Sequence, residues 1–541
     1  MIMNNKLGLL EQTDVINPLP NKPLLEFHLR NSIFVQMRQN LLQAMKTKRA
    51  EITVTLIFLL IYCLVSFVNH INFRTSSLDL GMFNQALYSF SHGKMNYFTL
   101  DLTGKSPIYF ADHFSPLTLL YIPFYFLFGS WTLLIIQIAS VILGAMGCYK
   151  IARLKFPTMK SPWLVLLFFL AQWAIISALA FDFHNNVVAA MLIPWFFFFH
   201  MTKRRWAAIL MFVLVLLAKE NMALWMFFIL AGMAFSRGLK HWKENLKLAL
   251  RFEFPLMLIS LVYFYIVVSK IMPGLSQGEA LSQIARFGKL GDSIPEIAKN
   301  VILHPIDTFK LLFWSQLTDP LSFGIKKELH WVVFFSGGFA LILRPAYLLM
   351  LVPIYAQKLF SDNMGMWGIN GQYSIEFTPI IALAMIDLAV KLKTDKQRFI
   401  LWSSAAFLAV LVNFITLKER TSFWYEATTH DFMKKAHYDA GGLNIAYANK
   451  VIQSIPENIP VSTSPCFGPR LANRDRLYHF PVIHDAQIIV VVKSTRSTYP
   501  VTPEQQTEIV NQLIESNQFK IRSNKNDILV LERIVPNKPN N

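Results

Sequence analysis

The chain has 541 residues, of which 54% are hydrophobic and only 16% are charged, and its formal net charge is +18. So little charge at this length excludes an ordinary soluble globular protein. The longest uncharged runs match the ~20 residues that a helix needs to cross a bilayer, and they lack the alternation of barrel strands. We therefore expect an all-α polytopic membrane protein.

Residues 1–50 are expected to form a cytoplasmic N-terminal segment. Within it, Phe34, Met37, Leu41 and Met45 recur at helical spacing among basic residues, which predicts an interfacial helix on the cytoplasmic leaflet. The first apolar run begins near residue 52, too late for a cleaved secretory signal. We interpret that run as an uncleaved transmembrane helix.

Basic residues cluster in short loops beside the apolar runs, a pattern typical of cytoplasmic loops and not of a nucleic-acid site. Placing these loops in the cytoplasm predicts about eleven spans in the plasma (inner) membrane, with the N-terminus inside and the C-terminus outside. The spans are expected at about 52–70, 131–150, 161–181, 185–202, 206–219, 221–236, 253–270, 331–343, 345–358, 375–390 and 399–417. The scheme closes only if the segment 116–128 is a non-crossing or re-entrant helix.

The expected transmembrane domain covers residues 51–417, with a first external loop at 71–130 and a long external loop at 271–330. The long loop contains two predicted short amphipathic helices. A connection of this length in a compact protein is usually functional, so we expect it to be a lid or a substrate-facing element.

Residues 418–541 are expected to form a small α/β domain outside the membrane. The patterns predict helices at 441–456 and 502–517, strands at 459–464 and 486–493, and a closing hairpin at 519–534, with Thr502 capping the second helix. This segment has no nucleophile elbow, phosphate loop or zinc spacing. The three cysteines of the chain show neither metal-ligand spacing nor a disulfide framework. We therefore interpret the domain as supporting or acceptor-handling.

Five junctions between predicted helices carry polar residues, and the crossing scheme places all five at the external face. They contribute Asp79; Asp112 and His113; Asp182 and His184; Lys219 and Glu220; and Gln372, Tyr373 and Glu376. Ionisable groups at membrane depth are costly and usually mark a site or a pathway. We therefore predict an external polar cavity with Asp79 in one wall. Plainer roles stay open: Asp79 could cap the helix that follows it, and Lys219 could pair with Glu220.

The stretches around these junctions are "SLDLGMFNQALYSFSHGK", "FADHFSPLTLL", "FDFHNNVVAAMLIPW", "LLAKENMALWM" and "GQYSIEFTPIIALA", and the tail contains "IPVSTSPCFGPRLANRDRLYHFP". Together they resemble a family of predicted prokaryotic membrane proteins known as domain of unknown function 2079. The layout also resembles the GT-C membrane glycosyltransferases, which have a carboxylate in the first external loop and often a C-terminal external domain. The resemblance implies inverting transfer of a sugar from a polyprenyl-phosphate donor to a lipid, glycan or protein acceptor, next to membrane lipids.

The resemblance also implies roles for the external residues. Asp79 would be the general base that takes the proton of the acceptor. The residues expected to bind substrate are Arg74, Asp112, His113, Asp182, His184, Lys219, Glu220, Gln372, Tyr373 and Glu376. Among these, Arg74 and Lys219, with His330 as a further candidate, would supply positive charge to the leaving phosphate. Metal-dependent relatives have paired acids where this chain has the single carboxylate of "DLG", so we expect no metal ligand, and a divalent cation stays an alternative.

A membrane transporter or lipid flippase is the main alternative to a transferase. Transporters commonly show internal repeats and charges in mid-helix on a path between both faces. The sequence shows no repeat, and its polar residues collect at one face. Glu253 and Asp387 are the two candidate exceptions, and both lie near predicted cytoplasmic ends.

Overall fold

The computed structural model describes residues 48–534 except 96, 103–107, 239–240 and 277–283. The interfacial helix predicted before residue 47 lies outside the described residues. Four helical segments are long and apolar enough to cross a membrane: Arg49–Ile71, Pro116–Lys155, Glu253–Leu275 and Asp395–Thr416. Large apolar side chains such as Leu56 and Leu60 are more than half exposed, as expected for a surface that faces lipid.

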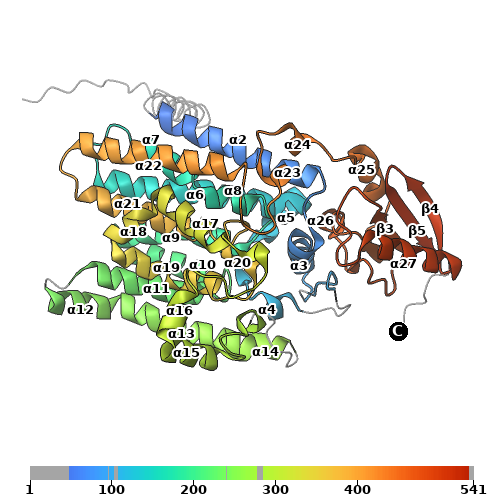
Figure 1. The fold of residues 1–541 in the computed structure, drawn as a ribbon, viewed down its shortest axis with the longest axis horizontal. Coiled ribbons are helices and arrows are strands. Elements are labelled where there is room, and N and C mark those ends of the chain that lie inside the picture. The colour runs from blue at the N-terminus through green and yellow to red at the C-terminus, as the bar shows by residue number, and fades with distance from the viewer. Residues whose placement is uncertain (1–47, 96, 103–107, 239–240, 277–283, 535–541) are drawn as a thin grey trace, which may run out of the picture. The chain divides into compact units, whose positions relative to one another are not determined.

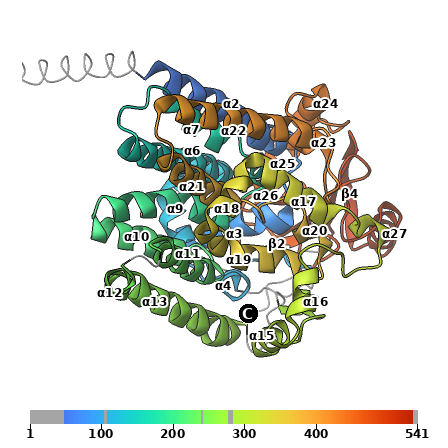
Figure 2. The same ribbon diagram turned by 60° about the vertical axis from the view of Figure 1, so that its left-hand side comes forward.

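The helices of the apolar region follow the predicted order. They are α2 (Arg49–Ile71), α5 (Ile122–Phe128), α6 (Thr132–Lys155), α7 (Trp163–Leu170), α8 (Trp173–Leu179), α9 (Asn185–Met201), α10 (Arg205–Leu216), α11 (Met222–Ser236), α12 (Trp242–Arg251), α13 (Glu253–Ile266), α14 (Met272–Leu275), α17 (Ile325–Val333), α18 (Phe339–Leu343), α19 (Pro345–Leu359), α20 (Met364–Trp367), α21 (Phe377–Val390) and α22 (Asp395–Thr416). Helices α6 and α9 lie side by side, as do α7 and α22 (Figures 1 and 2).

Two predicted helices are broken in the structure, so the count of eleven spans is not confirmed. The segment 161–181 forms α7 and α8 with a break at Ala171–Gln172, where the Gln172 amide donates to the carbonyls of Phe168 and Ser336 and so replaces lost helical bonds. The segment 331–343 is interrupted by η7 (Phe334–Gly338), where Gly337 has φ 102°. A side chain at Gly337 would also meet the ring of Phe168 at 2.6 Å, so only glycine fits this close crossing.

Shorter elements form the connections. Before α5 lie η1 (Ser77–Gly81), α3 (Met82–Ser91), α4 (Tyr109–Asp112) and η2 (Pro116–Tyr121), and η3 (Gly129–Trp131) joins α5 to α6. The two short helices predicted in the long external loop are present as α15 (Ile294–Leu303) and α16 (Pro305–Lys310), with η4 (Val267–Ile271), η5 (Ile284–Phe287) and η6 (Pro320–Ser322) around them. Residue Gly129, with φ 51°, ends α5, so the helix predicted at 116–128 is separate from α6.

The C-terminal segment forms an α/β unit with a five-stranded sheet in the order β2-β1-β3-β5-β4. Its elements are α23 (Ala427–His430), α24 (Lys435–Tyr438), α25 (Ile445–Gln453), β1 (Val461–Thr463), α26 (Gly468–Leu471), β2 (Leu477–His479), β3 (Ile488–Val492), α27 (Pro503–Glu515), β4 (Phe519–Lys525) and β5 (Ile528–Arg533). Strand β1 pairs in parallel with β2 and β3, whereas β5 is antiparallel to β3 and β4. The predicted Thr502 cap is confirmed, since Thr502 and Gln505 form a reciprocal capping box.

Each face of this sheet buries its own apolar layer. Helix α27 covers one face, where Val510 packs with Ile489 and Leu531. Helices α25 and α26 contribute to the layer on the other face. That layer also contains Phe73 and Leu100, which belong to the connection between α2 and α5. The C-terminal sheet therefore shares one hydrophobic core with the first predicted external loop.

Candidate functional site

Asp79 lies on a single wide helical turn, η1, whose backbone donors are satisfied from several parts of the chain. The Gly81 N–H donates to the carbonyl of Ser76 at 3.0 Å, which gives the i to i+5 spacing of a π-helix. The side chain of Ser76 accepts from Leu78 N–H at 3.3 Å. The Asp182 carboxylate accepts from the N–H groups of Ser76 at 2.8 Å and Leu80 at 3.4 Å. Asp182 therefore fastens the turn that presents Asp79.

Asp79 points its carboxylate at His184, with 3.4 Å between Oδ1 and the imidazole Nε2. The His184 side chain is buried, while that of Asp79 is 30% exposed. The imidazole stacks on Phe181 and meets the ring of Phe83 edge-on. No backbone N–H of the described residues donates to the Asp79 carboxylate, so Asp79 does not act as a helix cap here.

The loop between α8 and α9 is held by the side chain of a glutamine in the second turn of α6. Gln137 on α6 donates its amide N–H to the carbonyl of Asp182 at 2.7 Å and accepts the His184 N–H at 2.8 Å. Asp182 itself has φ 54°, a left-handed conformation that aspartate tolerates better than most residues. The clamp thus fixes the acid that holds the turn and the imidazole that faces Asp79.

Burial dominates the protonation of both loop residues. Burial, together with the neighbouring charge of Asp79, raises the pKa of Asp182, although the two backbone N–H groups that it accepts oppose this shift. Burial lowers the pKa of His184, and the nearby cations of Lys219 and His113 lower it further, against the attraction of Asp79. Burial therefore favours a neutral imidazole at His184.

A second pair of groups, Asp112 and His113, follows α4. The His113 Nδ1 lies 2.7 Å from the Asp112 carboxylate, and its ring stacks on Tyr109 and touches Phe83 edge-on. Burial would raise the pKa of Asp112, but His113, Lys219 and Arg286 outweigh it and hold the pKa at about 2. Asp112 is therefore a fixed anion, and both site imidazoles border the ring of Phe83.

Lys219 lines a small cavity between these two pairs, with a volume of about 10 Å³, which is room for roughly one water molecule. The other lining residues are Phe83, Tyr109, His113, Ser115, His184, Asn185, Asn186 and Ala218. The predicted alternative, an ion pair between Lys219 and Glu220, does not form: Glu220 accepts the backbone N–H of Phe114 at 3.1 Å. Lys219 makes no hydrogen bond or ion pair with the part of the chain that the structure describes. The cavity therefore carries an uncommitted ammonium group.

The segment before α21 closes another side of the cluster. The Asn186 amide donates to the Gln372 carbonyl at 3.1 Å and to Glu376 Oε1 at 2.9 Å, which connects Asn186 in the cavity wall to both residues. Glu376 is buried, and Tyr373 is half-buried in the same segment. Three of the five predicted junctions thus line the cavity, through His113, His184 and Lys219. The other two reach it indirectly, Asp79 through His184 and the Gln372–Glu376 segment through Asn186.

Two predicted cations lie apart from it. The Arg74 guanidinium donates to four backbone carbonyls between Thr428 and Asp439 and to the side chain of Asn69. His330 bonds the carbonyl of Leu312 at 2.8 Å, within the long external loop. Both are engaged by the protein itself.

The sequence reasoning missed Gln137, Phe83, Tyr109 and Asn186. A lone amide in the apolar helix α6 was a readable signal for Gln137, and "FDFHNN" contained Asn186. The aromatic residues Phe83 and Tyr109 could not be told from core residues by spacing alone. Among the described residues, no group of three or more acidic, histidine or cysteine side chains could hold a metal ion, so no chemical step below passes through one.

Comparison with known proteins identifies a family and a structural likeness. No curated protein matches the chain. The crystal structure of ArnT from Cupriavidus metallidurans in the apo state is similar at 12% sequence identity, covering 90% of this chain and 98% of that chain with a TM-score of 0.49. The sequence profile described as "Predicted membrane protein (DUF2079)" matches residues 69–530. The chain therefore belongs to the DUF2079 family of predicted multi-pass membrane proteins.

Proposed function

We propose that this protein is an integral membrane glycosyltransferase of the plasma (inner) membrane. It would transfer a sugar from a polyprenyl-phosphate donor to an acceptor at the outer face, with inversion at the anomeric carbon and Asp79 as general base. In this topology the N-terminus lies in the cytoplasm and the α/β unit lies outside. The acceptor belongs to one of three classes: lipid, glycan or protein.

The observation that carries this proposal is the arrangement of Asp79, His184 and Lys219. In the Asp79 turn, the Asp182 carboxylate accepts the Ser76 N–H and the Ser76 hydroxyl accepts the Leu78 N–H. The Asp79 carboxylate caps neither of them and faces His184. His184 and Lys219 both line the small cavity, and the ammonium of Lys219 has no protein partner among the described residues. A base that contacts the lining residue His184 and an uncommitted cation in the cavity wall are the two groups that transfer from a sugar phosphate requires.

The proposed transfer accounts for the bond formed, the bond broken and the proton moved with these groups alone. The acceptor oxygen or nitrogen attacks the anomeric carbon and forms the new bond, while its proton passes to Asp79. The bond between the anomeric carbon and the phosphate oxygen breaks, and its electron pair leaves with the lipid phosphate. Lys219 would stabilise the charge that develops on that phosphate. His184 would orient the Asp79 carboxylate, and the anion of Asp112 would hold His113 in place.

The cavity is too small for a complete sugar ring with its phosphate, so donor binding must open it. The long external loop is the candidate moving part. Arg286 of that loop lies close enough to Asp112 to lower the pKa of that carboxyl. The loop also bonds to the segment before α20, since Asp362 N–H donates to the Arg286 carbonyl at 2.6 Å.

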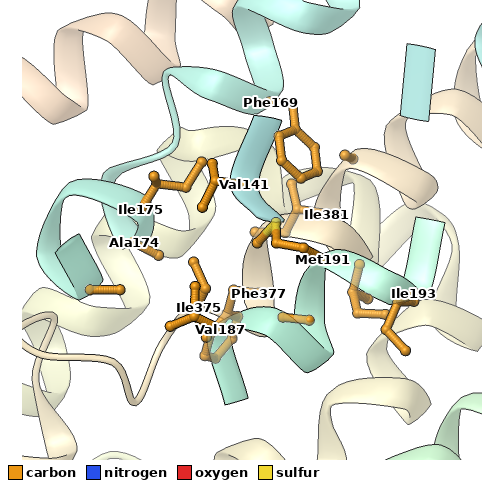
Figure 3. Packing of buried hydrophobic residues seen from close by; sticks show 14 of the residues in the cluster. Val141, Phe169, Ala174, Ile175, Val187, Met191, Ile193, Ile375, Phe377 and Ile381 are labelled. Atoms are coloured by element: carbon orange, nitrogen blue, oxygen red, sulfur yellow. The ribbon is translucent and has the colours of Figure 1, made fainter. Parts of the chain in front are cut away.

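A transporter would need a polar path to the other face. Glu253 and Asp387 do border a second cavity at the opposite ends of α9 and α21, but each is paired with an arginine, Arg237 and Arg344 respectively. Between the two cavities, α9 and α21 present buried apolar side chains such as Met191 and Ile381 (Figure 3). This packed layer favours a site at one face over a transmembrane path.

The test is transfer by purified protein in nanodiscs, supplied with radiolabelled polyprenyl-phosphate sugars and a membrane-lipid extract. Asp79→Asn should bind donor normally and lose transfer by about 10²–10⁴-fold, the usual worth of general-base catalysis. Lys219→Ala should instead weaken donor binding, with Lys310→Ala, an exposed lysine of the external loop, as the matched control. Full transfer by Asp79→Asn refutes the assignment of the base. If the native protein binds no donor, the transferase proposal fails and flux in sealed vesicles becomes the next measurement.

A further inference from the structure

The C-terminal α/β unit contacts the catalytic turn itself, and this contact is the start of the inference. Both the N–H and the hydroxyl of Ser77 donate to the carbonyl of Pro465, at 2.9 and 3.0 Å. Ser77 is completely buried and lies two residues before Asp79. The α/β unit therefore holds one side of the turn whose other side is held by Asp182.

Glycine makes this contact close. A Cβ atom at Gly468, the first residue of α26, would lie 1.9 Å from Ser77 Oγ, 2.9 Å from Ser77 Cβ and 3.1 Å from Ser77 Cα. Rotation of the hydroxyl could relieve only the first of these overlaps, and it would break the bond to Pro465. On the other side of the contact, a Cβ at Gly81 would lie 3.5 Å from the Gly468 backbone. The two segments thus meet backbone to backbone.

The same unit fixes the helix that follows the turn. On α3, Asn84 donates to the Pro469 carbonyl at 3.2 Å and Gln85 donates to the Arg474 carbonyl at 3.3 Å. The Thr99 hydroxyl both donates to the carbonyl of Leu477 at 2.6 Å and accepts its N–H at 2.8 Å, which extends the contact to β2.

The chain before the turn is held as well. Arg470 donates to the carbonyl of His70 at 2.7 Å, and Arg496 donates to that of Asn72 at 2.7 Å. The ring of Phe73 lies between Phe467 and the Arg470 guanidinium, in the core of the sheet. The α/β unit therefore holds the chain both before and after the turn.

We infer that the α/β unit is a positioning element for the reaction, acting through Ser77, Pro465 and Gly468 on the placement of Asp79. This inference rests on the proposed function. A single π-helical turn has poorer intrinsic stability than an α-helix and needs such outside support. A shift of the base by about 1 Å is enough to lower a rate about 10²-fold. The unit thus sets the geometry of a carboxylate that it does not touch.

The experiment compares single and double variants in nanodiscs. Gly468→Ala should lower kcat by about 10²-fold, and the milder Ser77→Ala, which keeps the N–H bond to Pro465, should lower it by about fivefold. In both, KM for the donor should stay within about twofold, because Lys219 and the cavity are unchanged. Asp475→Asn is the control, since it cuts only the exposed ion pair with Lys94 between the same two parts of the chain.

A second-site rescue separates positioning from general damage. The double variant Ser77→Gly with Gly468→Ala removes the two shortest overlaps and should recover at least tenfold of the kcat that Gly468→Ala loses. Hydrogen exchange of a peptide covering 76–82 supplies a readout that needs no activity: protection should fall in Gly468→Ala and return in the double variant.

The outcomes are distinct. Native protein that transfers no sugar refutes the proposed function and the positioning role with it. Native protein that transfers sugar, with Gly468→Ala equally active or impaired through KM alone, refutes the positioning role only. Loss of kcat together with faster exchange of the turn, both reversed in the double variant, establishes it.

Discussion

Replacing Asp182 by alanine tests how the turn that carries Asp79 is held. The change removes the oxygen that accepts the Ser76 N–H at 2.8 Å and the Leu80 N–H at 3.4 Å. A buried donor that loses its partner costs roughly 1–3 kcal/mol, and the longer contact belongs at the low end of that range. Alanine at the φ of 54° that Asp182 adopts adds about 1–2 kcal/mol. The turn should therefore lose roughly 3–6 kcal/mol of local stability.

Asparagine at the same position is the matched control. It keeps an acceptor oxygen for the two N–H groups and tolerates the left-handed backbone, so it should cost only about 1 kcal/mol. Hydrogen exchange of the 76–82 peptide should then accelerate by at least about thirtyfold in Asp182→Ala and by less than about tenfold in Asp182→Asn. Sugar transfer should fall in the same order. Equal exchange in the two variants, or no change in either, would refute the view that this carboxylate fastens the turn.

Two further outcomes follow from the same contacts. The pKa of Asp182 is raised from 3.8 to about 8, so between these pH values the folded state binds more protons than the unfolded state. The free energy of unfolding should therefore fall as pH rises through this window, by at most about 1.4 kcal/mol per pH unit. Asp182→Asn should flatten that part of a stability–pH curve, and an unchanged slope would contradict the assignment. Arg74→Ala should free the carbonyls of residues 428–439 at a cost of roughly 2–4 kcal/mol. Limited proteolysis should then cut this segment faster while KM for the donor stays constant, and a raised KM would instead place Arg74 in the donor site.

The sequence allows the prediction that these polar residues lie at one membrane face, because each of them stands at the end of a predicted helix. Charged loops fix which ends share a membrane face, and apolar runs fix where the helices end. Asp79, His184 and Lys219 are predicted at one face on these grounds; in the structure His184 and Lys219 line one cavity, and Asp79 contacts His184.

The internal breaks of the helices could not be predicted in the same way. Gln172 and Gly337 sit inside runs that are apolar enough for a continuous helix, and their breaks depend on partners far along the chain, Ser336 and Phe168. Hydropathy counts residues that favour the apolar phase, whereas a break is decided by whether another segment can take the freed backbone groups.

The role of each polar residue could not be predicted from the sequence either, because it depends on contacts with distant parts of the chain. The sequence predicts Arg74 and Lys219 alike as external cations. In the structure Arg74 donates to backbone carbonyls, whereas Lys219 has no hydrogen-bond partner among the described residues. Only the tertiary contacts of a charge tell whether it serves the fold or is left for a ligand.

The contacts of Asp79 and its neighbours likewise show which of these side chains serve the fold. In "SSLDLG" both serines and the aspartate are residue types that cap helices, and local pattern alone would let any of them do so. In the structure Ser76 accepts from Leu78 N–H, Ser77 is bound to Pro465, and Asp182, 106 positions from Ser76, accepts from Ser76 N–H. Three parts of the chain thus satisfy these donors of the turn, while its own carboxylate caps none of them and faces His184. A carboxylate that the fold holds in place without using it as a cap is the structural reason to propose the chemistry at Asp79.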